Sequence, residues 1–437
     1  MKMKIEVKVV STTIIKPSSP TPSHLRFYQL SFIDQMSNNI YNPFVMFYSA
    51  EEKSNRPANI VKLSHNLKKS LSIVLSQYYP LAGRIKDNFV LDCSDEGIPF
   101  SEAKVNGKLS DVIQQLDPAE LHKFVPFELD GQSDFLLGVQ LNIFDCGGIA
   151  ILSCVSHKIA DAFSSLMFIK FWALANQGDN DDKLEQLSPQ FISATIFPPK
   201  DISAIHIPRV HIPNKKIVTK RFVFDSSKID ALRGKYVKNQ LIKRPSRVEA
   251  LSAFISSRYI AATRVRPGKR FYAIAHAFNF RTRFDPPLPE NSFGNLSRQF
   301  IRPLDSTKGE EESYVDVLRQ MRDLISSGND KDNIKKLQEG IDQCFNFMNE
   351  HAEELSKGEI VTLNFTSLCG FRLYDQFDFG WGTPLWVGAN PPLFKNLVVF
   401  VDTKSGDGIE AYIDFEEEDM ARFERDDVFL SFVSSTT

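Results

Sequence analysis

The chain has 437 residues, of which 42% are hydrophobic and 24% are charged, and its formal net charge is −2. This composition is typical of a globular protein and excludes a largely disordered chain. A chain of this length favours two domains over one. No block of basic residues occurs, so we expect neither nucleic acid nor an anionic membrane surface as a partner.

The N-terminal segment and the cysteines indicate the compartment. Residues 1–22 do not read as a signal peptide, because Glu6 and Lys8 interrupt any apolar run. No apolar stretch approaches the roughly 20 residues of a membrane span. The five cysteines are scattered, odd in number and without a Cys-x-x-Cys pair, so free thiols are the simplest interpretation and no metal site is expected. We therefore expect a soluble cytoplasmic protein.

The N-terminal part of the chain is predicted to mix strands and helices. Alternating apolar residues over 5–9 predict an edge strand, and leucines at helical spacing predict a helix over 61–77. Residues 135–157 are typical of two strands joined by a turn at 145–148, where glycines suit positive φ angles. These patterns predict one α/β domain over residues 1–175.

The remainder of the chain is predicted to form a linker and a second domain. Residues 176–215 are rich in proline and polar residues and lack sustained periodicity, which predicts a linker. The pattern after this segment predicts a C-terminal α/β domain over residues 216–437. Within it we expect strands at 220–225, 269–284, 360–374 and 396–414, and helices at 246–263 and 310–354.

The most informative motif is His157-Lys-Ile-Ala-Asp161. Residues 149–156 form an unbroken apolar run, typical of a buried strand, and His157 follows directly. Asp161 precedes a helical pattern that ends at Gly178, so its carboxylate suits the N-cap of that helix, and this accounts for at least part of its role. His157 alone is compatible with an ordinary histidine. Its position at a strand end, however, favours a general base at a cleft.

A second motif, Asp378-Phe-Gly-Trp-Gly382, lies far downstream. The two motifs, in this order and separation, resemble those of the plant BAHD acyltransferase family. The resemblance extends along almost the whole chain, through the strings at 30–35, 79–84, 279–283 and 405–410. The amino-acid sequence at 17–22, 145–148 and 220–225 is most similar to the branch that contains vinorine synthase and salutaridinol acetyltransferase.

The resemblance implies a fold and a reaction. The fold would be two similar chloramphenicol-acetyltransferase-like α/β domains joined by a long crossover loop at 176–215, with a solvent channel at their interface. His157 would remove the proton of an acceptor hydroxyl, which attacks the thioester of an acyl-CoA directly through a tetrahedral intermediate. Acyl-CoA would be a co-substrate, with no permanently bound cofactor, no metal and no acyl-enzyme. A monomer is expected.

The resemblance also assigns further residues. Asp161 is expected to pair with Arg281 and so to hold the turn that presents His157. Asp378 is counted with the active residues, although its simpler interpretation is a turn packed by neighbouring aromatic rings. Contacts with CoA are expected from Ser246, Arg247, Gly294 and Asn295.

One departure from the family pattern concerns the acceptor pocket. Family members often carry Thr-Ser-Trp before the second motif, whereas this chain has Thr366-Ser367-Leu368. Our hypothesis is that Leu368 leaves room for a bulky, rigid acceptor. We therefore expect an acetyl-CoA-dependent O-acetyltransferase acting on a polycyclic alkaloid or terpenoid. An aromatic hydroxycinnamoyl- or benzoyl-type donor, an amine acceptor, and a non-catalytic binding protein on the same scaffold stay open as alternatives.

Overall fold

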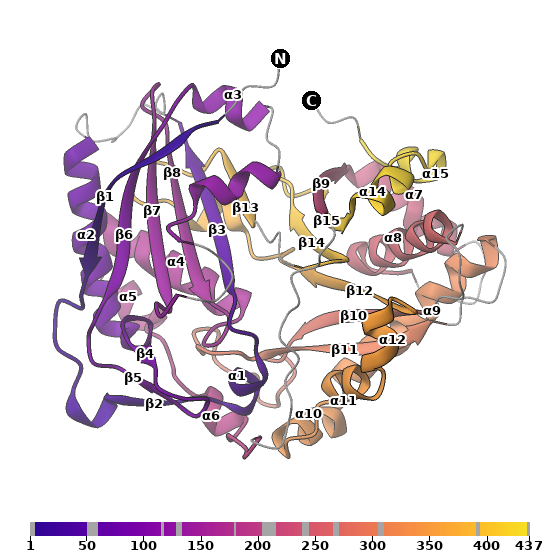
Figure 1. Cartoon of the computed structure of the whole chain (residues 1–437), viewed down its shortest axis with the longest axis horizontal. Helices are drawn as coiled ribbons and strands as arrows, with labels where there is room; N and C mark the ends of the chain where they lie inside the picture. Colours follow the sequence, from indigo (N-terminus) through magenta and orange to yellow (C-terminus); the bar gives the residue numbers. More distant parts are fainter. Residues whose placement is uncertain are drawn as a thin grey trace. The chain divides into compact units, whose positions relative to one another are not determined.

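The computed structural model consists of two units, each of which combines sheets and helices (Figure 1). Unit 1 comprises Met1–Val210, Phe284–Leu296 and Arg372–Leu393, and unit 2 comprises His211–Arg283, Ser297–Phe371 and Phe394–Thr437. The predicted α/β class is confirmed, while the predicted boundaries 1–175, 176–215 and 216–437 stay a prediction. The structure describes residues 5–49, 60–114, 118–127, 133–178, 181–202, 216–237, 244–264, 271–304, 310–389 and 394–434.

Unit 1 contains a six-stranded sheet of order β1-β6-β7-β8-β3-β13. Its neighbours are antiparallel except for the parallel pair β6 and β7. The predicted hairpin around 145–148 is confirmed, because β7 and β8 flank that turn. The strands are β1 (Val7–Ile15), β3 (Tyr41–Tyr48), β6 (Ile98–Val105), β7 (Leu137–Phe144), β8 (Ile149–Ser156) and β13 (Trp386–Ala389).

A smaller sheet of order β2-β5-β4 and several helices complete the described part of unit 1. The strands are β2 (Phe27–Gln29), β4 (Arg84–Ile85) and β5 (Val90–Asp92). The α-helices are α1 (Phe32–Met36), α2 (Ile60–Gln77), α3 (Leu109–Gln114), α4 (Ala162–Gln177), α5 (Asp181–Leu187), α6 (Ser193–Ile196) and α13 (Leu373–Gln376). The 3-10 helices are η1 (Ser23–Leu25), η2 (Tyr79–Ala82) and η3 (Pro118–Phe124).

The two longest helices of unit 1, α2 and α4, pack against each other. The helical leucine stripe of α2 is buried, which confirms the helix predicted over 61–77. The indole Nε1 of Trp172 in α4 donates to the Leu67 carbonyl at 3.3 Å and to Ser70 Oγ at 3.1 Å, both in α2. As predicted, α4 starts at an Asp161 N-cap and ends at Gly178, which has a φ of 72°.

The predicted linker is partly helical. Helices α5 and α6 occupy 181–187 and 193–196, although the sequence there shows no sustained periodicity. Each is short, so too few turns repeat for an apolar stripe to stand out. Residues 203–215 of the predicted linker lie outside the described residues, and its function as a crossover stays a prediction.

Unit 2 contains a six-stranded sheet of order β11-β10-β12-β14-β15-β9. The pairs β10–β12 and β12–β14 are parallel and the others antiparallel. The strands are β9 (Ile217–Phe224), β10 (Phe271–Asn279), β11 (Ser297–Leu304), β12 (Ile360–Ser367), β14 (Leu397–Asp402) and β15 (Ile409–Glu416). The helices are α7 (Ser226–Val237), α8 (Arg247–Thr263), α9 (Glu310–Asn329), α10 (Lys331–Gln338), α11 (Gln343–Glu350), α12 (Ala352–Lys357), α14 (Glu417–Phe423) and α15 (Asp427–Leu430).

The chain leaves the unit 2 sheet after β12 and adds strand β13 to the unit 1 sheet before it returns as β14. Trp386 of β13 pairs with Phe47 of β3 in antiparallel register. The motif at 378–382 therefore lies in unit 1. Strand β13 is only four residues long and contains Gly388, so its partner could not be inferred from local pattern.

Candidate active site

His157 lies directly after β8, in a turn that the backbone holds firmly. Its amide donates to the carbonyl of Ile40 at 2.7 Å, next to the start of β3. The amides of Ile159 and Ala160 both point back to the Ser156 carbonyl, at 3.2 and 3.3 Å. The imidazole itself is half-buried. The predicted placement of this histidine at a strand end is confirmed.

The side-chain amide of Asn295 contacts the imidazole and defines its tautomer. Asn295 Nδ2 donates to Asp34 Oδ1 at 2.7 Å and to the His157 carbonyl at 2.8 Å. Both partners are acceptors, so the amide nitrogen must face them and Asn295 Oδ1 must face His157 Nδ1, which lies 3.1 Å away. An amide oxygen can only accept. The proton of the neutral ring is therefore on Nδ1, and the lone pair is on Nε2.

Asp161 joins the start of α4 to the segment 294–296. Its carboxylate is buried, with Oδ1 accepting from the Ser164 amide at 2.8 Å and Oδ2 accepting from the Leu296 amide at 3.0 Å. Ser164 Oγ donates to the Gly294 carbonyl at 2.9 Å in the same region. The predicted N-cap role of Asp161 is thus confirmed, and the same carboxylate also helps to place Asn295 beside His157.

Arg281 and Leu368 belong to unit 2, and both are buried. Arg281 Nη1 donates to Asn279 Oδ1 at 3.2 Å. The amide of Leu368 donates to the Phe400 carbonyl at 2.8 Å, at the end of β12. The pairing of Arg281 with Asp161 and the pocket role of Leu368 stay predictions, as does a channel between the domains.

Two buried ionisable groups lie close to the histidine turn. Burial raises the pKa of Asp34 from 3.8 to about 6, against the opposing effect of its hydrogen-bond donors. Burial lowers the pKa of Lys158 from 10.5 to about 8, against the opposing effect of Asp34. Lys158 Nζ donates to the Gln35 carbonyl at 2.8 Å and lies 3.4 Å from the Ser37 carbonyl. The ammonium group therefore caps the C-terminal end of α1.

The sequence indicated neither Asp34 nor the contact of Asn295 with His157. Asp34 is part of the family string 30–35, but no chemical pattern connects that string to a histidine far along the chain. A signal for its local role was present, because Ser31 and Asp34 have the spacing of a helix capping box. Gly294 and Asn295 make the contacts described above, and their predicted binding of CoA stays a prediction.

The motif 378–382 forms a tight turn. Asp378 Oδ1 accepts from the amides of Gly380 and Gly382 at 2.7 and 2.9 Å, and both glycines have positive φ angles of 101° and 104°. The rings of Phe379 and Trp381 stack with their centroids 5.5 Å apart. These contacts support the structural interpretation of Asp378, and its part in catalysis stays a prediction.

This turn is anchored to the rest of unit 1. Asn176 Nδ2, near the end of α4, donates to the Phe379 carbonyl at 2.7 Å. Tyr48 of β3 donates its hydroxyl hydrogen to the Phe377 carbonyl at 2.8 Å. Trp172 of α4 meets the Phe379 ring edge to face at 4.9 Å. Helix α4 therefore connects the two family motifs, because its first residue follows Asp161 and its last turn contacts the turn at 378–382.

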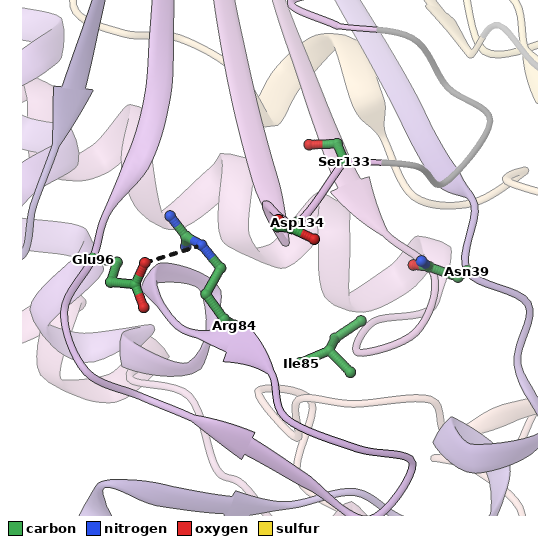
Figure 2. A pocket seen from close by; sticks show the side chains of 6 residues that line it. All are labelled: Asn39, Arg84, Ile85, Glu96, Ser133 and Asp134. Carbon is green, nitrogen blue, oxygen red and sulfur yellow. Dashed lines mark ion pairs between the residues drawn. The ribbon is translucent and has the colours of Figure 1, made fainter.

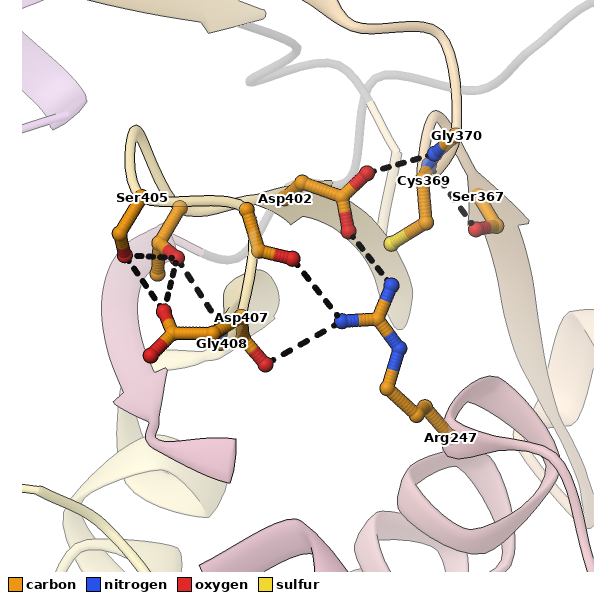
Figure 3. Close-up of polar contacts among 10 residues, drawn as sticks. Arg247, Ser367, Cys369, Gly370, Asp402, Ser405, Asp407 and Gly408 are labelled. Atoms are coloured by element: carbon orange, nitrogen blue, oxygen red, sulfur yellow. Dashed lines mark hydrogen bonds and ion pairs between the residues drawn. The ribbon is translucent and has the colours of Figure 1, made fainter. Parts of the chain in front are cut away.

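The predicted CoA contacts Ser246 and Arg247 lie at the start of α8. Ser246 Oγ accepts from the Glu249 amide at 3.1 Å and Glu249 accepts from the Ser246 amide at 2.6 Å, which is a capping box. Figure 3 shows the Arg247 guanidinium directed at Asp402, whose carboxylate lies 2.9 Å from Nη2. A phosphate at Arg247 would share the guanidinium with Asp402 or displace it, and CoA binding here stays a prediction.

A polar cavity of about 470 Å³ is lined by residues of unit 1 (Figure 2). Arg84 forms part of its wall and has several partners. Arg84 Nη1 donates to the carbonyls of Gly83 and Gly97 at 2.8 and 3.0 Å, and Nε lies 3.6 Å from Glu96. The charged lining does not match the mostly apolar pocket expected for a polycyclic acceptor. The lining residues are Asn39, Arg84, Ile85, Glu96, Ser133 and Asp134.

Comparisons with known proteins agree with the motif pattern. A family model described as "Transferase family" matches residues 5–430. The chain is 37% identical to a 13-O-acetyltransferase of 1,13-dihydroxy-N-methylcanadine from Papaver somniferum, over 96% of both chains. It is 35% identical to salutaridinol 7-O-acetyltransferase of the same organism, over 96% of both chains. The crystal structure of vinorine synthase matches with a TM-score of 0.84 and 35% identity, covering 98% of this chain and 99% of that one. In the part of the chain that the structure describes, no helix is long and apolar enough to cross a membrane.

Proposed function

Since the chain belongs to the Transferase family, which is the BAHD acyltransferase family, we propose that it transfers an acetyl group from acetyl-CoA to a hydroxyl of a polycyclic alkaloid or terpenoid. The names of the two Papaver relatives, both O-acetyltransferases, support the acetyl donor and the hydroxyl acceptor. The hydrogen bond between His157 Nδ1 and Asn295 Oδ1 carries the proposal, because it places the basic lone pair of the ring on Nε2.

The proposed reaction begins with proton removal by His157 Nε2. The acceptor hydroxyl gives its proton to Nε2 as its oxygen attacks the thioester carbonyl, and a tetrahedral oxyanion forms. The ring is then an imidazolium, which keeps its Nδ1 proton on Asn295 Oδ1 and carries the new proton on Nε2. When the intermediate collapses, the C–S bond breaks and the Nε2 proton passes to the CoA sulfur. The products are the ester and CoA thiol, and His157 returns to its starting tautomer.

Replacement of the general base tests this assignment. His157→Ala should lower kcat by about 10²–10⁴-fold, because proton transfer by a positioned base contributes a factor of this size. The matched control is His24→Ala, since His24 is exposed in the short helix η1. Thiol release from acetyl-CoA in the presence of acceptor measures the rate. A His157→Ala protein that is folded and fully active would overturn the role of His157. If the chain only binds its ligand, neither the wild type nor the variant would release thiol.

A matrix of donors and acceptors tests the substrate classes. Acetyl-, hydroxycinnamoyl- and benzoyl-CoA are each combined with polycyclic alkaloid and terpenoid alcohols and with amines. Free-thiol release and product mass are then measured. Acetyl transfer to hydroxyls should dominate. Preference for an aromatic donor or for an amine would replace the corresponding part of the proposal, and transfer from a donor other than a CoA thioester would overturn the donor assignment.

Leu368 tests the proposed acceptor size. If the missing indole provides the space for a rigid acceptor, Leu368→Trp should lower kcat/KM for polycyclic alcohols more than for small alcohols. Leu368→Met is the control, because it nearly conserves volume at this buried position. Unfolding of both variants in urea shows whether overpacking has damaged the fold. An equal effect on small and polycyclic alcohols contradicts the hypothesis.

The proposal includes a cytoplasmic monomer whose only partners are acyl-CoA and a small acceptor. The nearly balanced charge, with 52 basic and 54 acidic side chains, supports the absence of a nucleic-acid partner. Light scattering on the purified protein measures the oligomeric state. Fractionation of cells that produce the native chain tests the compartment, and recovery in an organelle or membrane fraction would contradict it.

A further inference from the structure

A buried carboxylate, Asp34, lies behind the candidate base. Asp34 belongs to α1, and its Oδ2 accepts from the Ser31 amide at 2.8 Å while Ser31 Oγ accepts from the Asp34 amide at 3.1 Å. This capping box uses only one oxygen of the carboxylate. The other oxygen, Oδ1, accepts from the backbone amide of Asn295 at 3.1 Å and from its Nδ2 at 2.7 Å. Asp34 is fully buried.

The double contact on Oδ1 helps to determine which way the Asn295 amide points. An amide group can turn either its oxygen or its nitrogen toward a neighbour, and the two forms have nearly the same shape. A carboxylate only accepts hydrogen bonds, so beside Asp34 the nitrogen must face inward. Asn295 Oδ1 then faces His157 Nδ1 at 3.1 Å. The His157 carbonyl accepts from the same Nδ2 at 2.8 Å, so Asp34 adds to this preference, and a neutral side chain at position 34 would weaken it.

We propose that Asp34 is a positioning residue that acts through Asn295 to keep the His157 ring protonated on Nδ1 and basic on Nε2. This inference rests on the proposed function of His157. The arrangement is a chain of hydrogen bonds from a buried carboxylate through an amide to the imidazole. The carboxylate acts without contacting the ring. It orients the amide of Asn295, and the oriented amide accepts the Nδ1 proton of the ring.

The energetic setting supports a role beyond helix capping. A buried charge is costly unless it is paired or hydrogen-bonded, and the N3 position of a capping box needs no carboxylate, because a neutral Gln serves there as Glu does. Among the described residues, the ammonium of Lys158 and the phenol of Tyr28 are titratable groups that interact electrostatically with Asp34. Neither group belongs to the chain of hydrogen bonds that joins Asp34 to His157, since Lys158 donates to carbonyls at the end of α1. The carboxylate oxygen toward Asn295 therefore serves the histidine rather than the helix.

Kinetics of Asp34→Asn test the inference in the full chain. The new amide is a weaker acceptor than the carboxylate, so the preference for the Asn295 orientation that places Oδ1 at His157 Nδ1 becomes smaller and the wrong tautomer gains population. We expect kcat to fall about 10–100-fold, the range found for partners that orient metal-ligating histidines, with little change in KM for acetyl-CoA. The acidic limb of the pH profile of kcat/KM should move to lower pH, because the imidazolium loses a nearby negative charge while Lys158 remains. Wild-type kcat and an unmoved limb in a folded variant would overturn the inference.

The matched control is Asp342→Asn. Asp342 is likewise a buried acidic residue at a helix start, where it is the N-cap of α11, with Oδ1 accepting from the Phe345 amide at 3.0 Å and Oδ2 contacting Arg298. Its replacement by Asn removes a buried charge and its ion pair with Arg298, keeps a side chain that can cap the helix, and leaves the contacts of Asn295 with His157. It should lower stability and leave the pH profile of kcat/KM in place. An equal shift of the limb in both variants would show a general effect of charge and overturn the specific role of Asp34.

Nitrogen NMR of the histidine side chains tests the same inference without any substrate. The chain has eight histidines, so His157 is identified in a ¹⁵N-histidine-labelled sample by the signal that is missing from His157→Gln. At a pH where the ring is neutral, the wild-type spectrum should show the Nδ1–H tautomer, and Asp34→Asn should shift population to Nε2–H. If Asp34→Asn does not fold, the wild-type tautomer still decides, because an Nε2–H ring contradicts the network. Failure of acetyl transfer with a correct tautomer would instead contradict the proposed function.

Discussion

The buried carboxyl of Asp34 predicts how stability depends on pH. Burial raises its pKa from 3.8 to about 6, so the folded protein binds this proton more tightly than the unfolded chain does. The stability that comes from the bound proton is present at low pH and is lost as the pH rises through 6. With these two pKa values, the group lowers the free energy of unfolding by about 2 kcal/mol between roughly pH 4.5 and pH 7. Lys158 does not interfere strongly, because its pKa of about 8 lies above this range.

Asp34→Asn removes this titration and supplies the test. Urea unfolding of the wild type and the variant is followed by tryptophan fluorescence at both pH values. The difference in unfolding free energy between wild type and variant should favour the wild type by about 2 kcal/mol more at the lower pH. At neutral pH the difference should be small, because relief of the buried charge offsets an unsatisfied amide proton that costs about 1–3 kcal/mol. A difference that is the same at both pH values would refute the reasoning.

Three further substitutions test the scaffold around the site by urea unfolding. Gly294→Ala should lower the free energy of unfolding by about 1–3 kcal/mol, because Gly294 has a φ of 129° and an added Cβ would lie 2.5 Å from Ser193 Cβ. The control Gly358→Ala, with open space around it, should cost less. Equal effects of the two substitutions would contradict the steric argument. Phe379→Ala removes a ring that is 1% exposed and should cost about 3–5 kcal/mol, whereas a loss below about 1 kcal/mol would show that its stacking is not part of the core. Ser246→Ala should cost about 1 kcal/mol, and an unchanged midpoint would mean that this capping box adds nothing.

Much of the local structure could be predicted because it depends on neighbouring residues in the sequence. The leucine stripe of α2, the apolar run of β8 and the Asp161 cap of α4 each carry a periodic or capping signal. Residues 396–414 were predicted as strand, and the structure divides them into β14 and β15 around a turn at 403–408. Such boundaries are hard to see because a short polar turn interrupts two apolar strands.

The candidate site could be predicted only at the residue that carries the motif. His157 ends a strand, and that position was visible in the sequence. Its partner Asn295 is 138 positions away, and Asp34 is 261 positions from Asn295. An asparagine and an aspartate have no periodic signal that connects them over such distances. The orientation of the ring therefore depends on tertiary contacts that a single sequence does not display.

The strand β13 has a consequence for the order in which the protein folds during synthesis. Tyr48 of β3 and Phe377, which precedes the turn at 378–382, are 329 positions apart and joined by a hydrogen bond, and β13 follows shortly after that turn. The sheet that presents His157 begins to emerge from the ribosome early, yet its edge strand is translated only near the end of the chain. Until then the free edge of β3 offers unpaired backbone groups to other chains. A nascent or truncated chain that stops before β13 should therefore be prone to aggregation and depend on chaperones, although it already contains the whole histidine motif.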